Sequence, residues 1–164
     1  MLEWLRTQGR GERRYGLVAS STASRLRAYG LGVSVNATDG TNIAHWYLNP
    51  PGDVRSSYAL EVTANEYTTQ GLELDFVGLC WGGDLTMSPG GWVTRRFSGT
   101  AWAKANGERR RFVLNSYRVL LTRAREGIVI WVPPGDPNDV TRAPEPYDRT
   151  AVFLEKCGAV ALTG

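Results

Sequence analysis

The chain has 164 residues, of which 42% are hydrophobic and 21% charged, and this composition predicts a single folded domain. It lacks both a run of about 18 apolar residues, the length that a membrane span needs, and a secretory signal, so we expect a cytoplasmic protein without a membrane partner. The net charge of +3 does not by itself indicate nucleic-acid binding, although all basic residues except Lys104 and Lys156 are arginines, which suit phosphate recognition. Two separated cysteines and one histidine predict no metal site.

The chain opens with a short amphipathic segment, residues 2–8, which is followed by the first predicted strand–helix unit. An apolar run begins at Tyr15, and the Ser/Thr cluster after it is suited to capping a helix over residues 23–29 that ends at Gly30. A strand, a cap and a helix in this order form the repeating unit of a parallel α/β sheet.

Residues 31–63 contain two short strand candidates, at 33–35 and at 58–63, on either side of an aromatic segment. The almost continuous apolar run over 74–81 predicts a central parallel strand that is covered on both faces. An insertion follows at about 82–107, in which a turn-rich stretch precedes a predicted β-hairpin.

The strongest predicted helix covers residues 108–125, where apolar side chains recur at helical spacing. Gly127 ends this helix, and residues 128–132 are predicted to form a buried strand. A loop rich in Pro and Asp leads to a last helix near 150–156 and to a short strand at 159–162. The alternation of elements predicts a mainly parallel α/β domain.

Three segments carry side chains that suit binding of nucleotides or nucleic acid. The loop over 64–75 contains Gly71, which lets the backbone approach a phosphate, and Glu73, which can accept hydrogen bonds from ribose hydroxyls. The strongest helix carries Arg123 about a quarter-turn from its apolar stripe, where a rigid positive charge can reach out to a phosphate. The helix start within 16–27 carries two arginines near free amides. Taken singly, each segment is better explained as an ordinary turn, a solvated helix edge or a capped connection.

Together, in their order and separation, the three segments resemble motifs of superfamily 1 helicases. The similar stretches are YRVLLTRAR at 117–125 for motif VI, QGLELD at 70–75 for motif V and, more loosely, VASSTASRLR at 18–27 for motif IV. With DVRSS at 53–57, the sequence is most similar to the Schlafen group 3-like DNA/RNA helicase domain family over nearly the whole chain. The resemblance implies that residues 1–164 form a single domain, the second (C-terminal) RecA-like domain of a helicase. Such a domain is a three-layer α/β domain of the P-loop NTPase type, with a mainly parallel sheet.

The resemblance also implies roles at an ATP site. Arg123 would be the arginine finger that contacts the γ-phosphate, and Arg25, or else Arg27, would be the motif IV arginine. Glu73 would bind the ribose or support the cleft, and Thr122 would couple the nucleotide to the strand-binding face. The residues implied as nucleotide-binding are Gln70, Gly71, Glu73 and Thr122.

Single-stranded DNA or RNA is the other partner that the resemblance implies, crossing the top of the domain. Base stacking on aromatic rings and contacts to backbone phosphates would supply the affinity. The candidates are His45, Trp46 and Trp81, although each is better explained as an aromatic of the core or of its edge.

No G-x-x-x-x-G-K-[ST] phosphate loop occurs in the sequence, and neither lysine follows a glycine. We therefore expect no significant ATPase activity and no tight binding of ATP or Mg²⁺ by this chain alone, and a requirement for an N-terminal RecA-like domain in cis or in trans. Met1 would then lie near the boundary between the two RecA-like domains, in an excised domain, a split gene or a truncated remnant. The alternative is a non-catalytic nucleic-acid- or protein-binding module derived from a helicase fragment.

Overall fold

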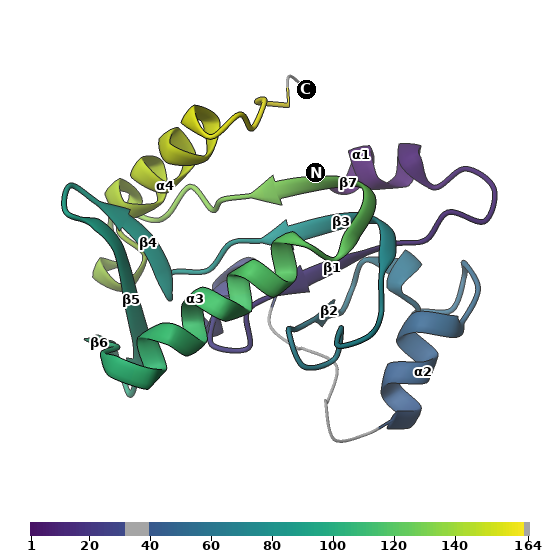
Figure 1. Ribbon diagram of the computed structural model, residues 1–164, viewed down its shortest axis with the longest axis horizontal. Coiled ribbons are helices and arrows are strands. Elements are labelled where there is room, and N and C mark those ends of the chain that lie inside the picture. Colours follow the sequence, from purple (N-terminus) through teal and green to yellow (C-terminus); the bar gives the residue numbers. More distant parts are fainter. Residues whose placement is uncertain (32–39, 163–164) are drawn as a thin grey trace.

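Parallel and antiparallel strands form two separate sheets in the computed structural model, which describes residues 1–31 and 40–162. Within these residues, a parallel sheet has the order β2-β1-β3-β7 and an antiparallel sheet has the order β4-β5-β6 (Figure 1). The parallel strands are β1 (Tyr15–Ala19), β2 (Thr63–Ala64), β3 (Leu74–Cys80) and β7 (Ala124–Trp131). The antiparallel strands are β4 (Leu85–Ser88), β5 (Gly91–Ser98) and β6 (Ala101–Lys104). The predictions of a mainly parallel α/β fold and of a β-hairpin within 82–107 are confirmed.

Helices pack on both faces of the parallel sheet. Figure 1 shows α3 crossing one face, and α1 lies against β1 and β3 on the other. The α-helices are α1 (Leu2–Gln8), α2 (Gly40–Leu48), α3 (Gly107–Leu121) and α4 (Pro144–Lys156). The 3₁₀ turns are η1 (Ser24–Tyr29), η2 (Ser57–Ala59) and η3 (Val140–Arg142). In the part of the chain that the structure describes, no helix is long and apolar enough to cross a membrane.

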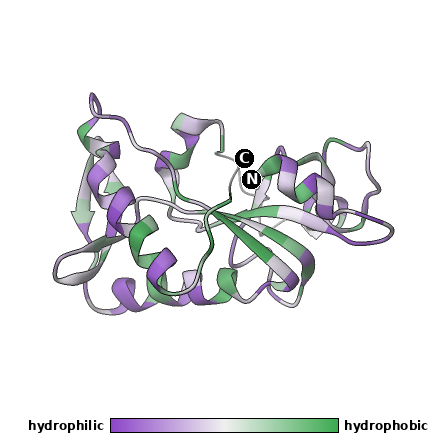
Figure 2. Ribbon diagram, turned by 90° about the horizontal axis from the view of Figure 1, so that it is seen from above, coloured by the Kyte–Doolittle hydropathy of each residue, from purple (hydrophilic) through white to green (hydrophobic). Residues whose placement is uncertain are grey.

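Alternation along β3 divides the core in two, because successive side chains of a strand point to opposite faces. Val77 and Leu79 pack with the α3 face, while Phe76 and Cys80 pack with Leu5 of α1. Figure 2 shows the hydrophobic residues concentrated in the strands of this sheet. The prediction of a central strand covered on both faces is therefore confirmed.

Close packing of α1 on the sheet depends on Gly78. A Cβ atom at this position would lie 2.7 Å from a methyl carbon of Leu5 and 2.8 Å from one of Leu17. Because real Cβ atoms do not approach other atoms so closely, a side chain here would push α1 away from the sheet.

The prediction of a helix over 108–125 is wrong at its end. Helix α3 stops at Leu121, Thr122 is its C-cap residue, and β7 already begins at Ala124. Sheet pairing overrides the helical pattern here, because Ala124 lies in register with Leu74 and the Leu74 amide donates to the Arg123 carbonyl at 3.1 Å. Arg123 therefore lies in the link between helix and strand.

Other differences arise where local turns override an apolar pattern. The candidate at 58–63 is largely not a strand, because Leu60 has a left-handed φ of 59° and only the two residues of β2 pair with β1. The helix over 23–29 is a 3₁₀ turn, and the aromatic segment lies in α2. The turn-rich stretch before the hairpin contains β4, the last helix begins at Pro144, and residues 159–162 form no strand. The candidate at 33–35 lies outside the described residues.

Candidate functional site

The carboxyl end of β1 is a topological switch point. In the order β2-β1-β3-β7 the chain places β2 on one side of β1 and β3 on the other. Open α/β sheets bind ligands beside such a point, at the carboxyl ends of the strands. The segments that follow β1, β2 and β3 meet here. Ser21, after β1, is hydrogen-bonded to Glu66, after β2, and Thr22, after β1, is hydrogen-bonded to Asp84, after β3.

Glu66 joins three elements at this end of the sheet. Its carboxylate accepts a hydrogen bond from the Ser21 backbone amide at 2.9 Å and from the Ser21 hydroxyl at 2.5 Å. The Ser116 hydroxyl on α3 donates to it at 3.0 Å. Because Glu66 is buried and its hydrogen bonds are satisfied, it fixes the loop after β2 against the loop after β1 and against α3.

Asp84 is fully buried next to this group. Its two oxygens accept hydrogen bonds from the Thr22 hydroxyl at 2.7 Å and from the Tyr117 hydroxyl at 2.8 Å, and the Tyr117 oxygen accepts one from the Gly82 amide at 2.9 Å. Burial raises the pKa of Asp84 above its ordinary 3.8, because a charged carboxylate loses hydration in the core. Asp84 is therefore part of the scaffold under the site and does not face solvent.

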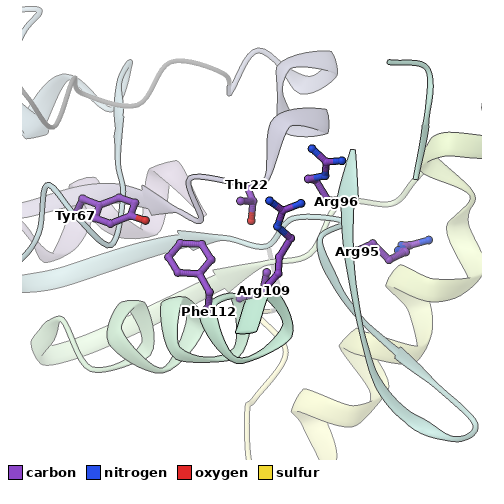
Figure 3. Close-up of a pocket in the computed structure, with 7 residues that line it drawn as sticks. Thr22, Tyr67, Arg95, Arg96, Arg109 and Phe112 are labelled. Atoms are coloured by element: carbon purple, nitrogen blue, oxygen red, sulfur yellow. The ribbon is translucent and has the colours of Figure 1, made fainter. Parts of the chain in front are cut away.

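A cavity of about 260 Å³ opens above Thr22, and we call it the arginine–aromatic cavity. Tyr67, from the loop after β2, stacks on Phe112 of α3 with 5.9 Å between ring centroids and 23° between ring planes. Figure 3 shows the two rings beside Thr22 and arginines on the other side. The cavity is lined by Thr22, Tyr67, Arg95, Arg96, Arg109, Phe112 and Val113.

The three arginines of the cavity differ in what they contact. Arg95 and Arg96 are adjacent on β5, so their side chains point to opposite faces. Arg95 donates to the Gly83 carbonyl at 3.1 Å and lies over the Trp102 ring at 5.0 Å. Arg96 and Arg109 are exposed, and within residues 1–31 and 40–162 neither side chain has a hydrogen bond or an ion pair. Figure 3 shows Arg109 extending from α3 towards Arg96.

The motif V segment and the part of the motif VI segment that carries Arg123 and Arg125 lie at the opposite, amino end of β3 and β7. The Arg123 guanidinium donates to the Val119 carbonyl at 3.1 Å and to the Thr69 carbonyl at 3.4 Å. Arg125 and Glu73 form an exposed ion pair at 3.2 Å. The structure thus brings the two segments together.

Three more implied residues lie at this end. Thr122 donates its hydroxyl to the Val119 carbonyl at 3.0 Å, which caps the end of α3. Gln70 is exposed. Gly71 has a φ of 76° with no atom within 4 Å of where a Cβ would be, so this turn needs glycine for its backbone conformation and not for lack of space.

Arg25 does not lie with Arg123. It follows the carboxyl end of β1, whereas Arg123 precedes the amino end of β7, and the strands of this sheet run parallel. Arg25 pairs with Asp139 at 2.5 Å and lies over the Phe97 ring at 5.1 Å. Arg27 is exposed on the same turn, η1.

The three aromatic candidates for base stacking are mostly covered. Trp46 and Trp81 are each only 1% exposed, and their ring nitrogens donate to the carbonyls of Val62 and Leu85. His45 is half-buried on α2. Neither tryptophan therefore offers a free ring face in this structure.

Sequence reasoning missed the residues around the switch point. Glu66 and Asp84 each follow a strand by a few residues, and an acid in that position is a usable signal. Arg96, Arg109 and Tyr67 come from three separate segments, and only the fold brings them to one cavity.

A mainly parallel sheet with helices on both faces and a polar switch point defines an α/β protein of the β–α–β class. Residues 1–134 match the family described as Schlafen group 3, DNA/RNA helicase domain, so the chain belongs to that family, as its motif-like segments indicated. Neither the curated proteins nor the solved structures gave a match.

Proposed function

We propose that the chain is the second RecA-like motor domain, with three-layer architecture, of an ATP-dependent DNA/RNA helicase or translocase. In this proposal it supplies an arginine finger and part of the nucleic-acid track, and a first RecA-like domain supplies the phosphate loop. One observation carries the proposal: Arg123 of the motif VI segment donates to the carbonyl of Thr69, the residue directly before the motif V segment, and to that of Val119. Membership of a helicase-domain family is consistent with it.

The environment of Arg123 suits a finger. Its side chain is half-buried, and among the described residues it contacts backbone carbonyls and no carboxylate. Two of its nitrogens are held, so the charge is positioned in advance and still lacks an anionic partner. A preset guanidinium stabilises negative charge on the γ-phosphate oxygens as phosphoryl transfer proceeds.

ATP would contact this chain at the amino end of β3 and β7. The γ-phosphoryl group of ATP would be transferred to water there. Gln70 and Glu73 lie on the loop next to Arg123 and would contact the nucleoside. No group of three His, Cys, Asp or Glu side chains that could hold a metal ion occurs in residues 1–31 and 40–162, and we assign Mg²⁺ to the first domain. Arg25 would have to leave Asp139 to reach a phosphate, so we assign it a supporting role.

The test combines the chain with a first RecA-like domain of the same family, in trans or as a fusion. We expect little ATP hydrolysis by the chain alone and hydrolysis stimulated by single-stranded nucleic acid when both domains are present. Arg123→Ala should lower kcat by about 10³-fold, the size of effect known for arginine fingers. The control is Arg110→Ala, because Arg110 is an exposed arginine of α3 outside both motif segments and should leave kcat unchanged.

Two results would contradict the proposal. One is a helicase-like rate of ATP hydrolysis by the chain alone. The other is normal stimulated hydrolysis by the Arg123→Ala variant in the two-domain protein.

A second function, a non-catalytic binding module, is favoured by the arginine–aromatic cavity. Arg96 and Arg109 present positive charge that no described residue pairs, beside an exposed aromatic ring, and such a surface can bind single-stranded nucleic acid without ATP. Nucleic-acid binding with no ATPase activity in the two-domain protein would favour this second function.

A further inference from the structure

We infer that the arginine–aromatic cavity holds one nucleotide of a single-stranded nucleic acid, with its base on Tyr67 and its flanking phosphates on Arg96 and Arg109. The inference rests on the proposed function and specifies where the nucleic-acid track lies. It also assigns a role to the insertion at 82–107, because β5 carries Arg96.

Charge is the first argument for a polyanionic ligand. Three of the seven lining residues are arginines, and no acidic side chain lines the cavity. Arg95 is already engaged by the Gly83 carbonyl and the Trp102 ring, so it braces the hairpin. Arg96 and Arg109 come from different elements and converge on the same space (Figure 3), and their guanidinium groups can each bind a phosphate through paired hydrogen bonds.

The aromatic pair is the second argument, and it favours a base over a simple anion. Tyr67 is 50% exposed, and one face of its ring is supported by Phe112 at 5.9 Å. A supported and exposed ring is a platform on which any base can stack. Phosphate-binding arginines beside such a platform match the alternation of phosphate and base along a single strand.

Rigidity is the third argument. Tyr67 directly follows Glu66, which is tied to Ser21 and Ser116, and Thr22 on the cavity floor is tied to Asp84. The loop after β2 is therefore fixed before any ligand arrives, which lowers the entropic cost of binding.

Size favours one unit of a strand over a whole nucleoside triphosphate. The cavity measures about 260 Å³, which is slightly less than the about 300 Å³ at the lower end of pockets that enclose a drug-sized ligand. It is also open to solvent at Arg96 and Arg109, which are exposed, so a strand can enter and leave it.

The test measures binding of fluorescein-labelled oligonucleotides, dT and rU of twelve residues, to the full chain by fluorescence anisotropy at several salt concentrations. Arg96→Ala/Arg109→Ala should reduce the slope of log Kd against log salt by about 1.4, because each phosphate contact to a single strand contributes about 0.7. Tyr67→Ala should weaken binding about tenfold with no change in slope, and Tyr67→Phe should bind normally.

The matched control is Arg110→Ala/Arg118→Ala, which removes the same charge from exposed positions of α3 outside the cavity. Its salt slope and affinity should stay close to those of the unchanged protein. Equal losses in both double variants would overturn the inference, since they would indicate general attraction to a basic surface. Absence of oligonucleotide binding by the unchanged chain would also overturn it.

A competition experiment distinguishes two ligands that both contain phosphate and a base, namely a single strand and a free nucleotide such as ATP. Unlabelled oligonucleotide should displace the probe, whereas ATP at millimolar concentration should not. Displacement by ATP that is lost in Arg96→Ala/Arg109→Ala would make the cavity a mononucleotide site and overturn the inference. Because the assay involves no ATP hydrolysis, its failure would leave the Arg123 test of the proposed function unaffected.

Discussion

The two ends of the parallel sheet hold their polar groups in different ways. At the carboxyl end, Glu66 and Asp84 are buried and their oxygens are satisfied by hydroxyl and amide groups of neighbouring loops. At the amino end, Arg123 contacts backbone carbonyls, and the Glu73–Arg125 ion pair is exposed. Buried networks with satisfied hydrogen bonds are rigid, while exposed pairs are screened and contribute little stability.

This difference matches the two tasks that we propose. A binding platform for a strand needs fixed geometry, which buried acids can provide at the carboxyl end. A finger that completes the ATP site of another domain needs a held charge that lacks an anionic partner, and Arg123 at the amino end is held by backbone carbonyls alone among the described residues. The comparison can be tested by removing one group at a time from each end.

The largest effect on stability is expected from Asp84→Ala. It leaves the buried Tyr117 hydroxyl without its acceptor and leaves the half-buried Thr22 hydroxyl with Ser20 as its only side-chain partner among the described residues, and each buried unsatisfied group costs about 1–3 kcal/mol. We expect the free energy of unfolding in urea to fall by about 3 kcal/mol. Asp148→Ala, which changes an exposed acid of α4, is the control and should change it by less than about 0.5 kcal/mol. Similar losses in the free energy of unfolding for the two variants would contradict the view that the buried acids fix the carboxyl end of the sheet.

A smaller effect, and one that depends on pH, is expected from Asp84→Asn. Burial raises the pKa of the folded-state carboxyl above 3.8, so the folded protein binds this proton more tightly than the unfolded chain does. The contribution of this proton to the free energy of unfolding is fully present below pH 3.8 and is lost as the pH rises through the raised folded-state pKa of Asp84. Asparagine is neutral throughout.

We therefore expect the unchanged protein to lose stability relative to the Asp84→Asn variant as the pH rises over this interval. Urea unfolding of both proteins at about pH 3 to pH 8 measures the difference. Asp148→Asn is again the control and should show no such trend. A difference that is constant with pH would mean that Asp84 is not neutral in the core, and that the carboxyl end is less dry than the structure indicates.

The sequence could predict those elements that depend on local pattern, and it could not predict those that depend on long-range contacts. Apolar runs predicted β3 and β7, and the periodicity of α3 was recognisable, because each depends on local pattern and burial. The end of α3 was misplaced since pairing of Ala124 with Leu74 is a long-range contact that no helical pattern contains. Leu60, with its left-handed backbone, broke a strand that its apolar neighbours favoured.

The candidate sites were predictable to different degrees for the same reason. Each of the two motif segments is one short stretch of sequence, so Arg123 and Glu73 could be proposed as site residues from their motifs. The arginine–aromatic cavity combines Tyr67, Arg96 and Arg109, which only the packing of the insertion against α3 brings together. Trp46 and Trp81 were candidates because of residue type alone, and both lie in the core.

The smallest effect on stability is expected from breaking the Glu73–Arg125 ion pair at the amino end. The two side chains are 54% and 63% exposed, and exposed pairs contribute about 0–1 kcal/mol because water and salt screen them. A double-mutant cycle with Glu73→Ala and Arg125→Ala, measured by urea unfolding, should give a coupling below about 0.5 kcal/mol. The exposed Arg149–Glu145 pair on α4 provides the matched control. A coupling well above that of the control would mean that the motif V loop is fixed to β7, and that the amino end is as rigid as the end that carries the buried acids.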